Sequence, residues 1–119
     1  MATAKKTRRS ARLSNAQLDA VARRFRALGV TSRLQVLDAL MAGPLSMSEL
    51  LEATGLSQSN LSRQITELER AGCVLRERSG REVSVHIADP TLKQLCELVC
   101  GSLERQASDT HKALRTRGS

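Results

Sequence analysis

Two short helical patterns separated by a single glycine place the strongest constraint on the fold of this chain. The first, SMSELLEATG, opens with Ser46 and Glu49 at the Ser-x-x-Glu spacing of a capping box and ends at Gly55. The second, LSQSNLSRQITELERAG, starts at a new N-cap, Ser57, and carries leucine and isoleucine at helical spacing. Two short helices joined by a tight glycine turn predict a helix-turn-helix.

Other helical patterns precede this pair. Between residues 16 and 28 apolar side chains recur at spacings of three and four, which predicts an amphipathic helix that ends near Gly29. A second helix, which Thr31 or Ser32 can cap, follows it and is stopped by Gly43 and Pro44. The helix-turn-helix is therefore expected to follow two other helices.

The chain after this pair predicts a hairpin and a last helix. CVLRERSGREVSVHI alternates apolar and polar residues on either side of Ser79 and Gly80, which is typical of two antiparallel strands. Asp89 followed by Pro90 is a strong helix start, and an apolar stripe continues from there to Leu103. A hairpin in this position would be a wing.

These elements predict a mainly α protein of the α+β class, a winged helix-turn-helix with about five helices and a two-stranded β-hairpin wing. Too little chain remains to cover the apolar faces of the first and last helices, so we expect a homodimer in which both are buried. The predicted domain spans residues 16–103, between a basic disordered arm at residues 1–15 and a polar basic tail at residues 104–119.

Net charge is concentrated at the two ends of the 119-residue chain, which carries +7 overall. Residues 1–14 hold five basic residues and no acid, and residues 102–119 have an excess of two bases, so the part between is neutral. Basic arms on a neutral body are typical of proteins that bind polyphosphates such as DNA, and a solubilising role for the arms is the simpler alternative.

Composition argues against several other classes of protein. One phenylalanine and no tyrosine or tryptophan disfavour the base-stacking surfaces that bind RNA or single strands. No apolar run approaches the roughly 18 residues of a membrane span, and three cysteines without a secretion signal indicate thiols, so we expect a cytoplasmic protein that does not bind membranes. No cysteine lies beside a histidine and no glycine-rich phosphate loop exists, so we do not expect an enzyme.

The polar start of the second short helix matches what a helix in the major groove of duplex DNA requires. Gln, Asn, Ser and Arg side chains fit base edges, and these residues are expected on or near the face opposite Leu61, Ile65 and Leu68. The hairpin adds arginines, which Glu77 and Glu82 could instead pair with. The predicted DNA-binding residues are Ser57, Gln58, Ser59, Asn60, Ser62, Arg63, Gln64, Arg76, Arg78 and Arg81.

Three motifs carry a resemblance to a known family, namely ALGVTSRLQVL, SQSNLSRQITELERAG and GREVSVHIAD. With these motifs, about residues 16–103 resemble the ArsR/SmtB family of winged-helix repressors. The resemblance implies a homodimer that binds a pseudo-palindromic double-stranded DNA operator, and that leaves it or binds less well when an effector reaches the dimer. The alternative is an effector-independent winged helix used only for dimerisation or protein docking, which would show no sequence preference on DNA.

Of two metal sites that the resemblance brings into question, one is absent from this sequence and the other is incomplete. Ser46 and Ser48 occupy the places of a Cys-x-Cys pair, and Thr91 stands where relatives have the histidine of an Asp-x-His pair on the last helix. Gln64 occupies a place where many relatives have histidine. The effector of this chain is therefore expected at other residues.

Cys96 and Cys100 on the last helix are the candidate effector residues. At a spacing of four their Cβ atoms lie about 5–6 Å apart. A disulfide requires about 3.5–4.5 Å, so such a bond within one helix would be strained. A soft metal or metalloid ion such as arsenite, an oxidant or reactive sulfur species, and simple packing of the thiols all stay open. Cys73 is expected to be a buried strand residue.

Overall fold

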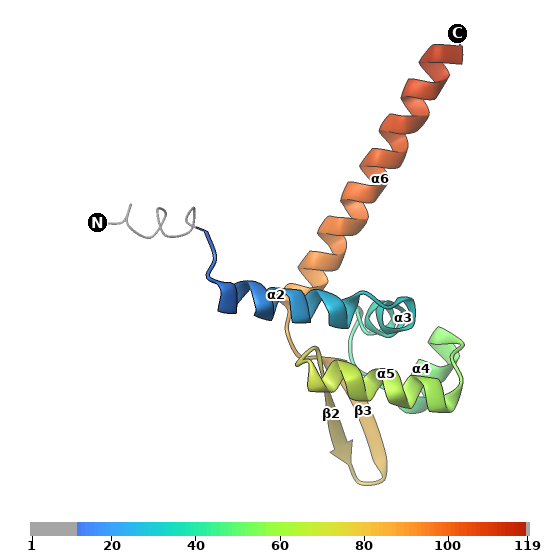
Figure 1. Ribbon diagram of the computed structural model, residues 1–119. Helices are drawn as coiled ribbons and strands as arrows, with labels where there is room; N and C mark the ends of the chain where they lie inside the picture. The colour runs from blue at the N-terminus through green and yellow to red at the C-terminus, as the bar shows by residue number, and fades with distance from the viewer. Residues whose placement is uncertain (1–11, 119) are drawn as a thin grey trace.

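The computed structural model describes residues 12–118, with side chains described through residue 111. Most of the predicted basic arm, residues 1–11, lies outside the described residues. Figure 1 shows α2 to α5 and the wing gathered in one body, from which α6 extends. The elements in chain order are α2 (Asn15–Leu28), α3 (Thr31–Ala39), β1 (Leu45–Ser46), α4 (Met47–Thr54), α5 (Gln58–Arg70), β2 (Val74–Ser79), β3 (Glu82–Ile87) and α6 (Thr91–Gly118).

The helix-turn-helix consists of α4 and α5, and local hydrogen bonds set both helix starts. The N–H of Ser46 donates to Glu49 Oε1 at 2.8 Å and the N–H of Glu49 donates to Ser46 Oγ at 3.2 Å, so the predicted capping box is confirmed. Gly55 ends α4 with a φ of 72°, a conformation that glycine adopts without strain. Ser57 Oγ then accepts from the N–H of Asn60 at 3.2 Å and starts α5.

The start of α3 differs from its prediction. Its N-cap is Val30, whose backbone is extended and whose side chain makes no capping hydrogen bond, so the expected cap by Thr31 or Ser32 is wrong. Val36 and Leu37 of this helix are buried. Packing of these side chains, and not a polar cap, therefore stabilises α3.

Three antiparallel strands form the sheet, in the order β1-β3-β2. β2 and β3 are the predicted hairpin, in which Val74 pairs with Ile87 at one end and Ser79 with Glu82 at the other. Gly80 in the turn has a φ of 63°, which favours glycine. The predicted hairpin is therefore confirmed, but its turn lies one residue later than expected, at Gly80 and Arg81, because Ser79 still pairs with Glu82.

The third strand, β1, was not expected from the sequence, which predicts a wing of two strands. Leu45 pairs with Val85, and Ser46 pairs with Ser84. Two residues are too few to show the alternation by which a strand is recognised in a sequence. Because β1 runs directly into α4, it joins the helix-turn-helix to the middle of β3 in the wing.

The hydrophobic core lies between α3, α4, α5 and the sheet. It is aliphatic, because the single aromatic residue, Phe25, stays 55% exposed. Cys73 is buried as predicted, and this burial raises the pKa of its thiol. The largest fully buried side chains are those of Val36, Leu37, Leu40, Leu50, Leu61, Ile65, Leu68, Cys73, Val74, Val85 and Leu92.

Asp89 starts α6, as predicted. The N–H of Thr91 donates to Asp89 Oδ1 at 2.9 Å, and Arg24 Nη1 lies 3.3 Å from Asp89 Oδ2. The hydrogen bond from Thr91, with a further contribution from Arg24, lowers the pKa of Asp89. The carboxylate is therefore charged at neutral pH and joins α2 to the start of α6.

α6 is longer than its apolar pattern predicts. The pattern predicts a helix to Leu103 and a polar tail after it, whereas the helix continues to Gly118. No proline or glycine interrupts residues 102–117, so helical hydrogen bonds can propagate beyond the packed first turns. Figure 1 shows α6 leaving the body on the side away from the wing. No helix among residues 12–118 is long and apolar enough to cross a membrane.

Apolar side chains of α2 and α6 stay exposed in the single chain, as expected for faces that need a partner. Leu98 is 70% exposed. A groove of about 830 Å³ with an apolar lining runs between α2, α3 and α6. Exposed apolar side chains on the two helices that border such a groove indicate an interaction site. We call the exposed apolar side chains of these two helices the apolar stripe. They are Leu18, Val21 and Phe25 on α2 and Leu98, Val99 and Leu103 on α6.

Candidate nucleic-acid interface

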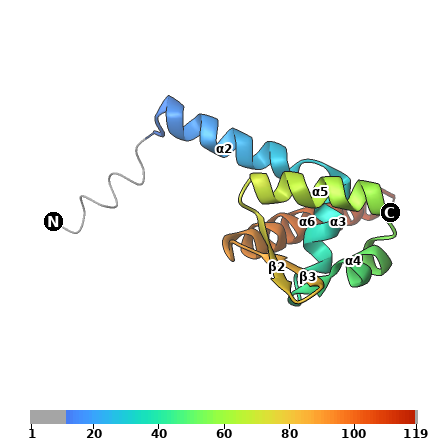
Figure 2. The same cartoon turned by 90° about the horizontal axis from the view of Figure 1, so that it is seen from below.

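The start of α5 presents polar side chains to solvent. Gln58, Ser59, Ser62 and Arg63 are all exposed, as the sequence predicts. Figures 1 and 2 show α5 on the outside of the body, with the hairpin beside it. The unpaired N–H groups at this end of the helix add partial positive charge. The surface therefore offers both base-reading side chains and an environment that attracts phosphate.

Ser57 has a different task from its neighbours on α5. Its hydroxyl oxygen accepts the N–H of Asn60, so this side chain fixes the helix start. The hydroxyl proton is not used by this bond and can still be donated. Of the residues predicted to bind DNA, Ser57 therefore has an established structural role as well.

Gln64 does not lie on the exposed face, so its predicted placement there is wrong. It is 7% exposed and is packed with the buried leucines and isoleucine of α5. Its Nε2 donates to Asn60 Oδ1 at 2.9 Å, and its Oε1 accepts from Arg33 Nε, also at 2.9 Å. Arg33 also donates from Nη1 to the carbonyl of Ala27 at 3.3 Å. Gln64 thus connects the α2–α3 junction to α5.

Asn60 lies between this buried chain of hydrogen bonds and the exposed face. Its Oδ1 accepts from Gln64 on the inner side and from Arg63 Nη2, at 3.3 Å, on the outer side. These two bonds orient the amide and leave its Nδ2 group as a donor. Asn60 is half-buried and Arg63 is exposed, so the pair stands at the edge of the polar surface.

The wing arginines differ from one another in their partners. Arg76 Nε lies 3.3 Å from Glu69 Oε1, and Arg76 Nη2 donates to Thr66 Oγ1 at 2.8 Å, so this side chain joins β2 to α5. Arg78 and Arg81 are exposed and make no ion pair with the described side chains. The alternative that Glu77 and Glu82 pair with the wing arginines is therefore not seen among the described side chains. Arg78 and Arg81 extend the positive surface beyond α5.

Sequence reasoning missed the residues that hold this surface in place. Arg33, Thr66 and Glu69 orient Gln64 and Arg76, but none of them has a motif that marks such a role. A signal existed for the burial of Gln64, because it lies three and four residues from Leu61 and Leu68, on the same helical face.

The two candidate effector cysteines lie away from the polar surface. Cys96 is half-buried and Cys100 is exposed, and both line the groove between α2, α3 and α6. Burial, with smaller effects of Asp38 and Glu97, raises the pKa of Cys96, so its thiol is protonated at neutral pH. Within the part of one chain that the structure describes, no group of three or more His, Cys, Asp or Glu side chains could hold a metal ion.

Comparison with known proteins places this fold in a family. The sequence model of the MarR family matches residues 27–82, which run from the end of α2 to the start of β3. The transcriptional regulator NmtR of Mycobacterium tuberculosis is 36% identical over 92 residues, which are 77% of each chain. The matched segments contain the complete helix-turn-helix.

Solved structures of similar proteins have the same fold as this chain. The crystal structure of M. tuberculosis Rv0081 is 34% identical, with a TM-score of 0.73 over 81% of this chain and 97% of that chain. The homodimeric winged helix-turn-helix domain of Mycobacterium bovis Mb0332, described as a possible ArsR-family regulator, is 30% identical, with a TM-score of 0.73 over 83% and 94% of the two chains. The sequence and fold together show that this chain belongs to the ArsR/SmtB family of winged helix-turn-helix transcriptional regulators.

Proposed function

We propose that this protein is a homodimeric transcriptional repressor that reads DNA with the start of α5 and holds the adjacent backbone with the wing. The observation that carries the proposal is the exposed set Gln58, Ser59, Ser62 and Arg63 on a helix whose opposite face is fully packed. A helix that is rigidly held in this way can present base-reading groups at fixed positions.

The side chains of α5 and of the wing have different roles at the DNA. Gln58 has an amide, which suits the N6 and N7 edge of adenine, and Arg63 has a guanidinium, which suits the O6 and N7 edge of guanine. Asn60, whose Oδ1 is already bonded to Gln64 and Arg63, offers its Nδ2 group as a donor to a base acceptor. Arg78 and Arg81 bind phosphates, while Arg76 holds the wing against α5. A DNA-binding regulator acts where the DNA is, which supports the expected cytoplasmic location.

The homodimer follows from the apolar stripe. A second copy related by two-fold symmetry can bury the exposed side chains of α2 and α6 from both chains in one interface. In the same arrangement two α5 helices reach two half-sites of an operator that has the same symmetry. The homodimeric structure of the relative Mb0332 supports this assembly.

The test is a binding assay with the full-length, reduced protein. DNA from upstream of its own gene is compared with a scrambled duplex of equal length and composition, at one salt concentration. We expect tighter binding of the upstream DNA by about 1,000-fold or more. Equal affinity for both duplexes would overturn the proposal and favour a winged helix that serves only dimerisation or docking.

We further propose that the effector acts at Cys96 and Cys100. Both thiols line the groove beside the apolar stripe, so a group bound there would change the surface that joins the two copies. Because the pKa of Cys96 is raised, binding of a soft ion must displace a proton and weakens as the pH falls. Oxidation would likewise begin from the small thiolate fraction.

The effector test adds arsenite, soft divalent ions, peroxide and polysulfide in turn to the complex with upstream DNA. We expect one of these to release the wild type but not the Cys96→Ser/Cys100→Ser variant. Cys73→Ala is the matched control. Because Cys73 is buried in the core, this variant is expected to respond to the additive as the wild type does. If no additive releases the wild type, the cysteines are packing residues and the proposed effector site is wrong.

A further inference from the structure

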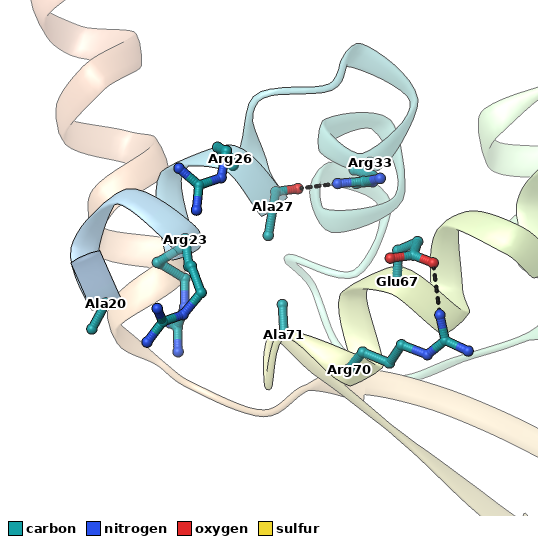
Figure 3. A pocket seen from close by; sticks show the side chains of 9 residues that line it. Ala20, Arg23, Arg26, Ala27, Arg33, Glu67, Arg70 and Ala71 are labelled. Atoms are coloured by element: carbon teal, nitrogen blue, oxygen red, sulfur yellow. Dashed lines mark hydrogen bonds and ion pairs between the residues drawn. The ribbon is translucent and has the colours of Figure 1, made fainter. Parts of the chain in front are cut away.

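A cavity with an arginine lining lies apart from the surfaces described so far. It has a volume of about 580 Å³ and opens between α2, the start of α3 and the end of α5. Figure 3 shows side chains of α2 and α5 on two sides of an open space. Its charged lining residues are Arg23, Arg24, Arg26, Arg33, Arg70 and Glu67. The rest of the lining is alanine, whose small side chains leave the cavity open.

Acidic partners balance only part of this charge. Arg24 pairs with Asp89 at 3.3 Å, and Arg70 pairs with Glu67 at 3.1 Å. Among the described residues, Arg33 bonds two neutral oxygen atoms, those of Gln64 and Ala27, and no carboxylate. The lining therefore retains positive charge after its internal ion pairs are counted.

Two cavity arginines, Arg23 and Arg26, have no side-chain bonding partner in the part of the chain that the structure describes. Neither Arg23 nor Arg26 makes a hydrogen bond or an ion pair with any described side chain through residue 111. Guanidinium groups gathered around one space repel each other unless an anion lies between them. The cavity lining thus carries more positive charge than the ion pairs of the described residues neutralise.

The proposed homodimer leaves this cavity open. At 100° per residue, Ala20, Arg23 and Ala27 lie on a face of α2 that is turned away from Val21 and Phe25 of the apolar stripe. A second copy that covers the stripe therefore covers the other side of α2. The cavity also lies at the end of α5, whereas the proposed base-reading residues lie at its start.

We propose that this cavity binds a phosphate group. The planar guanidinium donates paired hydrogen bonds that match phosphate oxygens, and several arginines can share the charge of one phosphate or of two linked phosphates. The volume is in the range of small-molecule sites, so the group can belong to a free phosphorylated molecule. It can also belong to the DNA backbone, in which case the inference rests on the proposed function.

The test uses the full-length protein and two variants with the same type of change. Arg23→Gln/Arg26→Gln removes the two arginines that have no partner among the described side chains, so the ion pairs of Arg24 and Arg70 remain. Arg105→Gln is the control, because Arg105 is an exposed arginine on α6 outside the cavity. Equal midpoints of thermal unfolding for the three proteins establish that each is folded.

The first arm asks whether a free phosphate compound binds. Pyrophosphate is titrated at constant ionic strength, and the Nε–Hε signals of the arginines are followed by NMR. We expect saturable shifts for Arg23 and Arg26 in the wild type, the same affinity in Arg105→Gln, and an affinity lower by about tenfold or more in the double variant. Saturable binding that persists unchanged in the double variant would place the anion elsewhere and overturn the inference.

The second arm asks whether the DNA backbone is the source. The affinity for upstream DNA is measured against salt concentration, and the slope of log K on log salt falls by about 0.9 for each phosphate that the protein no longer neutralises. A smaller slope for the double variant alone identifies the DNA backbone, and an unchanged slope with pyrophosphate binding identifies a free compound.

Failure of this inference differs from failure of the proposed function. If the wild type prefers upstream DNA but shows neither pyrophosphate binding nor a change of slope in the double variant, only the phosphate site is wrong. If the wild type has no preference for upstream DNA, the proposed function is wrong, and the pyrophosphate titration still decides whether the cavity binds phosphate.

Discussion

At the scale of single residues, Asn60 shows how the interior of the protein determines the surface. Its Oδ1 accepts from Gln64, which Arg33 in turn fixes, and from the exposed Arg63. A base-reading amide or guanidinium is useful only if its direction is set before DNA arrives. The buried hydrogen bonds supply that direction, so changes at Gln64 and at Arg63 have different consequences.

Gln64→Ala tests the buried part. The change leaves Arg33 Nε without its acceptor and leaves a small space among the core leucines of α5. We expect a loss of about 1–3 kcal/mol in the free energy of unfolding, measured in urea. Gln58→Ala is the matched control, since Gln58 is exposed and its loss is expected to leave stability unchanged. Equal stability of both variants would contradict the role given to Gln64.

Arg63→Ala tests the exposed part. We expect affinity for upstream DNA to fall by about 1–3 kcal/mol, with a much smaller decrease on scrambled DNA, because the variant can no longer bond a base edge. Arg105→Ala removes the same charge from α6, outside the interface, and is expected to keep the preference. Equal decreases for Arg63→Ala on both duplexes would mean that Arg63 contacts only the backbone.

At the scale of elements, the sequence predicts those features that have a local cause. The capping box of α4, the glycine that ends it, the cap of α5 and the turn of the wing each depend on residues within a few positions of one another. β1 and the hydrogen bond from Arg33 to Gln64 depend on contacts that are distant along the chain, such as Leu45 with Val85. Local pattern cannot contain these contacts.

For the site as well, features with a local cause could be predicted and features set by distant contacts could not. The exposed residues at the start of α5 could be identified, because helical spacing separates them from the buried stripe. The residues that orient them could not, because Arg33 comes from another helix and Glu69 acts on a strand. The arginine-lined cavity was missed for this reason, since its residues come from three helices.

The wing supports a prediction of its own. Arg78 and Arg81 are exposed, and neither has an ion-pair partner among the described side chains. We expect Arg78→Ala and Arg81→Ala to weaken binding to upstream and scrambled DNA alike, and each to reduce the salt slope by about 0.9. Fluorescence anisotropy over a series of salt concentrations measures both effects. Weaker binding confined to upstream DNA would show that the wing reads bases instead.

At the scale of the whole molecule, two surfaces with different tasks lie at a distance from each other. The wing and α5 lie on one side of the body, and α6 extends from the other (Figure 1). The apolar stripe lies on α2 and α6, so pairing of two copies through it leaves both α5 helices free. The cysteines lie beside the stripe, where a change can alter the relative position of the two α5 helices.

Phe25→Glu and Leu103→Glu test the assembly. Both side chains are more than half exposed in one chain, so the substitutions remove little core packing and instead place charge in the proposed interface. We expect monomers in sedimentation equilibrium, and weaker DNA binding with them. Leu75→Glu, at an exposed apolar residue of the wing, is the control and is expected to stay dimeric. A dimer that survives Phe25→Glu and Leu103→Glu would place the interface elsewhere.

The most direct measurement of the central claim is a hydroxyl-radical and guanine-methylation footprint of the wild type on upstream DNA. Two α5 helices of a homodimer predict two protected major-groove regions, with centres one helical turn, about 10–10.5 base pairs, or a multiple of it apart. The protected guanines should become accessible in Arg63→Ala. A single protected region, or protection that does not change in this variant, would contradict the account.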